Sequence, residues 1–226
     1  MKISYYDAIF VNPNRKDVTP VMRMLLVNNF LDQVKYASSI DTLHRAISDQ
    51  LEVSIEMIPY TDFVPEFVET HIDNIDAVVL SGTEAMLSKD SVQSAFKRTI
   101  EAVSLLHLPV LGICGGHQLI AQAYGERVLY IGRLLEGYRE VEVLVEDPIF
   151  HGLPTTFSVT QSHEEMVEHV PRGFTLLARS AETPIEAVRS NESGVLYGVQ
   201  FHPEFHDENH PAGKLILANF AKIVKR

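Results

Sequence analysis

Short apolar runs alternate with longer helical patterns along the first half of the chain, and this alternation constrains the fold more than any other feature. We predict strands at Tyr6–Val11, Val53–Ile58, Ala77–Leu80 and Val110–Ile113. Helical patterns lie between them, from Pro20 to about Gln50, with a break near residues 38–39, and from Ser91 to Leu106. Such alternation is typical of βαβ units, so the sequence predicts an α/β fold with a parallel sheet and flanking helices.

The pattern changes after Gly125, where short runs separated by turn residues replace the long helices. The segment Val141–Val145 alternates with acidic residues, as a strand with one exposed face does. Further strands are predicted at Thr156–Thr160, Phe174–Ala178 and Val195–Gln200, before a closing helix from about Pro211 to Val224. We interpret these strands as antiparallel additions to the parallel sheet. With no linker or repeat, residues 1–226 are predicted to form one domain.

Composition limits the partners and the location of the protein. The 226 residues include 19 Lys and Arg against 30 Asp and Glu, a net charge of −11 that repels phosphate groups. We therefore expect neither nucleic acid nor a membrane as partner. Asp7 interrupts the apolar start, and the most apolar stretch is too short to cross a bilayer, so we expect a cytoplasmic protein. Neither common glycine-rich nucleotide motif occurs, and we expect no cofactor.

The single cysteine, Cys114, lies between a predicted strand and a predicted helix, with Gly112 and Gly116 two positions away on either side. This is Gly-x-Cys-x-Gly, the thiol counterpart of the nucleophile elbow, in which glycines permit a sharp turn. The turn raises the side chain at the carboxyl edge of the sheet, where the N-terminus of the next helix favours the thiolate. We interpret Cys114 as a nucleophile rather than a buried structural cysteine.

A nucleophilic cysteine needs a base, and His202 is the strongest candidate among ten histidines. It follows an apolar strand, and Glu204 lies two positions later, so both side chains point the same way in an extended chain. Cysteine, histidine and an orienting carboxylate form the arrangement used for acyl transfer. His206 and His210 are four residues apart, but the polar residues between them favour the solvated start of a helix over a metal site. We expect no metal.

The motifs Gly-Ile-Cys-Gly-Gly-His-Gln and Gly-Val-Gln-Phe-His-Pro-Glu resemble those of the class I, triad-type glutamine amidotransferases. The likeness covers about residues 75 to 220 and is greatest to the amidotransferase domain of GMP synthase and its stand-alone relatives. It implies an open, flavodoxin-like, mostly parallel sheet. It also implies that Cys114 attacks the side-chain amide of glutamine, that His202 is the acid and base, and that Glu204 orients it.

The same resemblance implies where the substrate and the oxyanion bind. Gly115 supplies one backbone donor to the oxyanion, and the loop at Gly82 and Thr83 supplies the second. The family usually has glycine and proline where this chain has Thr83 and Glu84. Because β-branched Thr83 resists a positive φ, we expect the loop to need a partner to complete the oxyanion hole.

The residues implied to contact glutamine are Gln118 and the pair Ser162 and His163, which resemble the family's Ser-His turn. An ordinary polar turn is the alternative interpretation of that pair. The leading hypothesis for the whole chain is a glutaminase that releases ammonia for a separate synthase. A free-standing hydrolase of γ-glutamyl peptides or conjugates would use the same triad, and an inactive binding module of the same fold is a third alternative.

Overall fold

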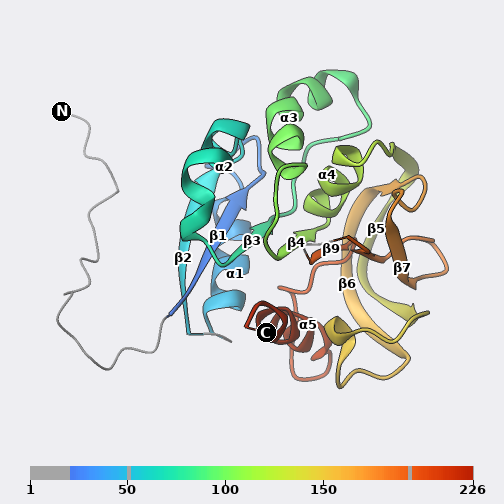
Figure 1. The fold of residues 1–226 in the computed structure, drawn as a ribbon. Coiled ribbons are helices and arrows are strands. Elements are labelled where there is room, and N and C mark those ends of the chain that lie inside the picture. Colours follow the sequence, from blue (N-terminus) through green and yellow to red (C-terminus); the bar gives the residue numbers. More distant parts are fainter. Residues whose placement is uncertain (1–20, 50–51, 193–194, 226) are drawn as a thin grey trace, which may run out of the picture.

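The computed structural model describes residues 21–49, 52–192 and 195–225, which form a nine-stranded mixed sheet flanked by five α-helices (Figure 1). The strand order is β2-β1-β3-β4-β9-β8-β7-β5-β6. The first five strands in that order are parallel to one another: β2 (Val53–Pro59), β1 (Met22–Asn28), β3 (Ala77–Leu80), β4 (Val110–Ile113) and β9 (Leu196–Val199). The predicted α/β class is therefore confirmed.

Strand β1 corrects the prediction of a helix from Pro20 to about Gln50. Among the described residues of that range, only Ala37–Ser48 form an α-helix, α1. In β1, Leu25 and Val27 belong to one hydrophobic core and Leu26 to the other, so the strand is buried on both faces. A strand covered on both faces loses the alternation that would identify it, and its apolar run cannot be told from a helix by periodicity. The predicted strand Tyr6–Val11 lies outside the described residues.

The helices cover the two faces of the parallel strands in separate layers (Figure 1). On one face, α1 and α5 (Ala212–Val224) pack against the strands, and on the other lie α2 (Pro65–His71), α3 (Asp90–Val103) and α4 (Gly115–Ala123). Helix α1 buries Ile40, Leu43 and Ile47, whose spacing of three and four residues places them on one stripe. The sheet thus lies between two hydrophobic cores, as in other doubly wound folds.

The antiparallel part extends the sheet beyond β9. It contains β8 (Ala187–Ser190), β7 (Phe174–Arg179), β5 (Val128–Val143) and β6 (Thr156–Val167). The predicted antiparallel strand at Val195–Gln200 is β9, which pairs antiparallel with β8 but parallel with β4. It is therefore the junction between the two parts, and the prediction was wrong about its neighbour on one side. This junction places the carboxyl end of β9 beside that of β4.

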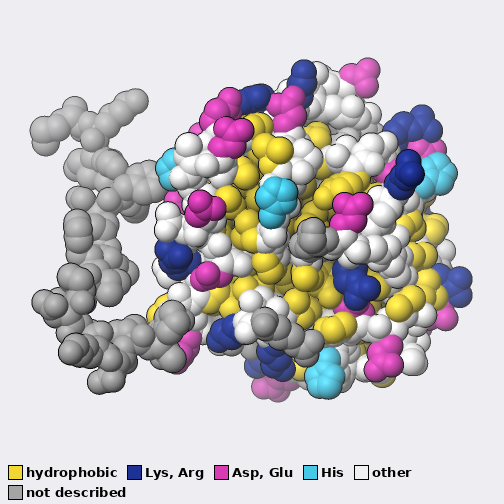
Figure 2. All heavy atoms as spheres, in the orientation of Figure 1, with side chains coloured by type: hydrophobic (Ala, Val, Ile, Leu, Met, Phe, Trp, Pro, Cys, Tyr) yellow, Lys and Arg dark blue, Asp and Glu magenta, His cyan; other side chains and the backbone are white. Residues whose placement is uncertain are grey.

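Figure 2 shows acidic and basic side chains interspersed over one face of the molecule, with hydrophobic side chains between them. Within the described part of the chain, no helix is both long enough and apolar enough to cross a membrane.

Candidate active site

Cys114 stands at the turn between β4 and α4, where the sequence predicts it. Its backbone has φ 50° and ψ −103°, and among the described residues it is the only non-glycine residue with a positive φ. Such a backbone conformation costs about 1–3 kcal/mol and persists only where the surrounding structure enforces it. Cys114 is also the N-cap of α4, so the positive end of the helix dipole lies at this turn. The turn has the geometry of a nucleophile elbow.

The glycines on either side of Cys114 are required by close packing. A Cβ atom added to Gly112 would lie 2.6 Å from backbone atoms of Gly116, and one added to Gly116 would lie 2.3 Å from the carbonyl oxygen of Leu80. Both distances are shorter than real Cβ contacts. Larger residues at either position would therefore push β3, β4 and α4 apart, which explains the Gly-x-Cys-x-Gly pattern physically.

His202 and Glu204 follow β9, and the parallel pairing of β9 with β4 brings them beside Cys114. Nδ1 of His202 lies 2.8 Å from Oε1 of Glu204. The backbone N–H of His202 donates to the carbonyl of Thr160 at 2.9 Å, which fixes the segment against β6. A Cβ atom on Gly82 would lie 3.2 Å from Cε1 of His202 and 3.8 Å from Cβ of Cys114. The three predicted triad residues therefore gather around one point.

The charges around His202 set its protonation. Burial alone would lower the pKa of His202, but the negative charges of Glu204 and Cys114 outweigh it and hold the pKa well above the ordinary value. The side chain is buried, and Nε2 has no hydrogen-bond partner among the described residues. A protonated imidazole beside a cysteine supplies both a proton donor and a stabilised thiolate.

The loop after β3 lies directly against the turn at Cys114. A Cβ atom on Gly115 would lie 2.9 Å from the backbone nitrogen of Thr83 and 2.5 Å from its Cγ2. The segments that carry the predicted oxyanion donors at Gly82, Thr83 and Gly115 are therefore neighbours. An oxyanion hole requires such convergence of backbone N–H groups from two segments.

The expected strain at Thr83 is absent, because Thr83 does not have a positive φ. Its Oγ1 accepts the N–H of Ala85 at 3.1 Å, and the carboxylate of Glu84 accepts the N–H groups of Leu31 and Asp32 at 3.2 and 3.0 Å. Hydrogen bonds within the chain therefore hold this loop. The premise that Thr83 must adopt a strained, positive φ was therefore wrong, whereas the need for a partner to complete the oxyanion hole stays a prediction.

A cavity of about 260 Å³ opens beside Cys114. The residues that line it include the predicted Thr83, Cys114, Gln118, Ser162 and His163, together with Tyr36, Glu84, Ala85, Met86, Leu134, Glu164 and Glu165. The carbonyl oxygen of Ser162 lies 4.0 Å from Sγ of Cys114. The volume is slightly below the range of about 300–1,000 Å³ typical of drug-sized ligands, which suits a single amino acid.

Ser162 and His163 do not form a turn, contrary to the prediction. They lie within β6, where Ser162 pairs with Glu136 and His163 pairs with Leu135 of β5. The register of this pair shifts between Tyr130 and Leu135, just before these partners. The polar composition suggested a turn, but long antiparallel pairing keeps the segment extended.

Residues 30–224 match the sequence profile of the family described as Glutamine amidotransferase class-I. The chain belongs to this family. A glutamine-hydrolysing GMP synthase subunit from Methanosarcina barkeri is 38% identical over 208 residues, covering 91% of this chain and 98% of that protein. The corresponding subunit from Pyrococcus abyssi is 39% identical over 150 residues, covering 66% of this chain and 76% of that protein.

A crystal structure of a proposed GMP synthase subunit from Thermoplasma acidophilum is similar to the whole fold. Its TM-score is 0.75 at 25% sequence identity, and the match covers 92% of this chain and 96% of that chain. This chain is accordingly a cysteine-dependent glutamine amidotransferase, and the family resemblance inferred from the two motifs is confirmed.

Sequence reasoning missed three buried polar side chains in this amidotransferase: Gln200, which contacts Cys114, and the hydrogen-bonded pair Gln161 and Glu186. Gln200 is fully buried, with Nε2 3.7 Å from Sγ of Cys114. Nε2 of Gln161 lies 2.9 and 3.0 Å from the two carboxylate oxygens of Glu186. Burial raises the pKa of Glu186 to about 7, although its hydrogen bond with Gln161 opposes this rise. The sequence did contain a signal for Gln200, which lies directly after the apolar strand and only two residues before His202.

The two histidines weighed as a metal pair have separate partners. Nδ1 of His206 lies 3.0 Å from the carbonyl oxygen of Pro203, whereas Nδ1 of His210 lies 3.0 Å from Oδ1 of Asp207. The ring of His210 also stacks on Tyr138 at a centroid distance of 3.6 Å. These contacts brace the segment after Glu204 against β5.

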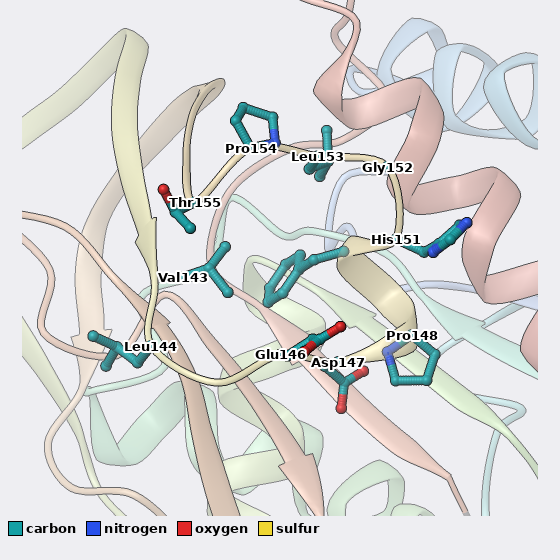
Figure 3. A pocket seen from close by; sticks show the side chains of 11 residues that line it. Val143, Leu144, Glu146, Asp147, Pro148, His151, Gly152, Leu153, Pro154 and Thr155 are labelled. Atoms are coloured by element: carbon teal, nitrogen blue, oxygen red, sulfur yellow. The ribbon is translucent and has the colours of Figure 1, made fainter.

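A larger cavity, of about 600 Å³, lies in the segment from Val143 to Thr155 (Figure 3). None of the predicted site residues lines it. Its buried acidic group, Asp147, already accepts hydrogen bonds from Tyr197 at 2.7 Å and from Arg189 at 2.6 Å. Volume alone therefore does not identify the active site of this amidotransferase.

His117, in the first turn of α4, should make the protein sensitive to acid. Burial, followed by the charge of His163, lowers the pKa of His117 from 6.5 to about 3. Because the unfolded chain binds this proton below pH 6.5 and the folded chain does not, stability falls as the pH falls through that window. Between pH 7 and pH 5 the loss at this site is about 2 kcal/mol.

Urea denaturation of wild type and of His117→Gln at both pH values measures this effect. The variant should lose about 2 kcal/mol less than wild type on acidification, whereas His107→Gln, a control at an exposed histidine, should behave as wild type does. Equal losses in wild type and His117→Gln would show that His117 is not the neutral buried group described above.

Proposed function

We propose that this chain is the ammonia-producing subunit of a two-subunit GMP synthase, with Cys114, His202 and Glu204 as its catalytic triad. The observation that carries this proposal is the convergence of the three side chains at the carboxyl ends of β4 and β9, beside a cavity that suits one amino acid. The names of the relatives indicate which synthase receives the ammonia, because each of the two reported above is one subunit of a glutamine-hydrolysing GMP synthase.

The reaction begins when the Cys114 thiolate attacks the side-chain amide carbon of glutamine. The resulting oxyanion is stabilised by the backbone donors at Gly115 and Thr83. His202 donates its proton to the departing nitrogen, ammonia leaves, and a glutamyl thioester remains on Cys114. His202 then takes a proton from water, the hydroxide attacks the thioester, and glutamate leaves as the thiolate returns. Glu204 keeps the imidazole oriented throughout.

Glutamine is positioned in the 260 Å³ cavity by groups on two elements. Gln118 comes from the first turns of α4, and Ser162 and His163 come from β6. The carbonyl of Ser162, close to Sγ of Cys114, is an acceptor that can orient the amino group of the substrate. The site thus combines a nucleophile at one end with hydrogen-bonding groups for the amino-acid head.

The test is a reconstitution with the remaining GMP synthase subunit of the source organism and its nucleotide substrates. With wild-type chain, either glutamine or ammonium should support GMP formation. With Cys114→Ala, ammonium alone should support it, because the acceptor chemistry lies on the other subunit. If this chain hydrolyses glutamine but never supports amination, the assignment to GMP synthase is wrong. Preferential hydrolysis of γ-glutamyl peptides would identify a free-standing hydrolase instead.

A further inference from the structure

A connected path of buried amide groups leads to the sulphur of Cys114 from the side of β6. Nε2 of Gln118 lies 3.1 Å from the backbone oxygen of Glu165 and 3.1 Å from Oε1 of Gln200. Nε2 of Gln200 lies 3.7 Å from Sγ of Cys114. Gln118 and Gln200 are both buried, so the orientation of their amide groups has a large energetic consequence.

The direction of every hydrogen bond on this path follows from its first member. The backbone oxygen of Glu165 can only accept, so the group of Gln118 that faces it must be the NH₂ group. The second N–H of that group then points at Gln200, which must present its carbonyl oxygen in return. Gln200 is thereby left with its own NH₂ group facing Sγ of Cys114.

Turning either amide over would be unfavourable at two places at once. A rotated Gln118 would place its oxygen against two other oxygens, the backbone oxygen of Glu165 and Oε1 of Gln200. A rotated Gln200 would place its NH₂ group against the NH₂ group of Gln118. The rotated Gln200 would also put an oxygen against the cysteine sulphur. Nδ1 of His163 contacts the same oxygen of Glu165 at 2.8 Å, so that carbonyl is held as an acceptor from two sides.

The backbone holds Gln200 in place as well. Its N–H donates to the carbonyl of Glu186 at 2.8 Å, which continues the pairing of β9 with β8 by one residue. Gln200 is two residues before His202, so the donor amide and the imidazole reach Cys114 from the same strand end.

From this geometry we propose that Gln200 is a further catalytic residue, which donates an amide N–H to the Cys114 thiolate, and that Gln118 is the positioning residue that orients it. The inference rests on the triad role of Cys114 proposed above. Hydrogen bonds from neutral donors to ionised acceptors are stronger than those between neutral groups. The amide remains a donor after His202 has given its proton to the leaving ammonia, so it can stabilise the thiolate when deacylation expels it.

The experiment measures the thiolate directly, in the absence of glutamine. Cys114 is the single cysteine of the chain, so alkylation by iodoacetamide and the ultraviolet absorbance of thiolate both report on this residue alone. Gln200→Leu removes the donor with little change of volume and should slow alkylation at neutral pH about tenfold. Gln200→Met also removes the donor, keeps the side chain unbranched and should slow alkylation to a similar degree.

Gln118→Leu should also slow the alkylation of Cys114, but by less than Gln200→Leu does, because it frees Gln200 to rotate without removing the donor. The matched control is Gln122→Leu, which removes an α4 glutamine that donates to the carbonyl of Leu87 instead. This control should alkylate at the rate of wild type. Thermal unfolding of each variant shows whether it has kept the fold.

Wild-type alkylation rates in a folded Gln200→Leu or Gln200→Met variant would overturn the proposal. If Gln200→Leu unfolds, the unbranched Gln200→Met variant decides alone. In glutaminase assays, loss of the donor should lower kcat and leave KM for glutamine unchanged. Because alkylation requires neither glutamine nor a synthase subunit, this proposal can fail while the GMP synthase assignment stands, and the reverse also holds.

Discussion

Replacing Cys114 with alanine should reduce glutamine hydrolysis by on the order of 10⁶-fold, the loss observed when the nucleophile of a comparable triad is removed. The loss should be nearly complete because Cys114 is the single cysteine of the chain, so His202 and Glu204 then have no thiolate to activate. Alanine keeps the strained backbone at this turn and removes only the sulphur. Ammonia release under steady-state conditions measures the change, and thermal unfolding confirms that the variant is folded.

Labelling supplies an independent measure of the same prediction. A glutamine-mimicking electrophile should form one adduct on wild type, and mass spectrometry should place it on Cys114. The Cys114→Ala variant should remain unlabelled under the same conditions. Substantial hydrolysis by this variant would exclude the thioester mechanism altogether, whatever the geometry of the neighbouring residues.

The elbow at Cys114 could be predicted because its requirements are local. Gly112 and Gly116 are needed where backbones approach closely, and the strand and the helix on either side have recognisable patterns. Strand β1 could not be predicted in the same way. Its side chains are buried on both faces, so the feature that distinguishes a strand from a helix is missing from the sequence.

The position of His202 depends on the pairing of two strands far apart in the sequence, which no local pattern predicts. The segment before it was predicted to be an antiparallel strand, but it pairs in parallel with β4. Only this pairing places the end of β9 beside Cys114. The two sequence motifs and their family resemblance predicted that Cys114 and His202 lie together, whereas local periodicity could not predict it.

The buried polar side chains that the structure revealed could not be predicted for a different reason. Gln161 lies in β6, Glu186 directly before β8 and Gln200 directly after β9, and the side chain of each has a hydrogen-bond partner far away in the sequence. Buried polar groups are tolerated because such partners exist, and the partners are defined only by the fold. A one-dimensional pattern shows the residues but not the hydrogen bonds.

His202 and Glu204 should be unequal in their contributions to the rate. His202→Ala removes the group that moves the proton, and we expect a loss on the order of 10⁶-fold, similar to that of Cys114→Ala. Glu204→Gln should cost about 10⁴-fold, as replacement of the orienting carboxylate does in related triads. Glu208→Gln, an exposed substitution in the same segment, should leave the rate close to wild type.

The contacts of Glu204 explain why its substitution is still costly. Oε1 accepts from Nδ1 of His202 at 2.8 Å, whereas Oε2 is buried and has no hydrogen-bond partner among the described residues. In Glu204→Gln the amide oxygen can still accept from the imidazole, but the NH₂ group would then be buried without an acceptor. The negative charge that raises the pKa of His202 is also lost, so the protonated imidazole should persist only to a lower pH. Steady-state kinetics across pH measure both effects, and a Glu204→Gln enzyme slower than His202→Ala would show that the two roles have been assigned wrongly.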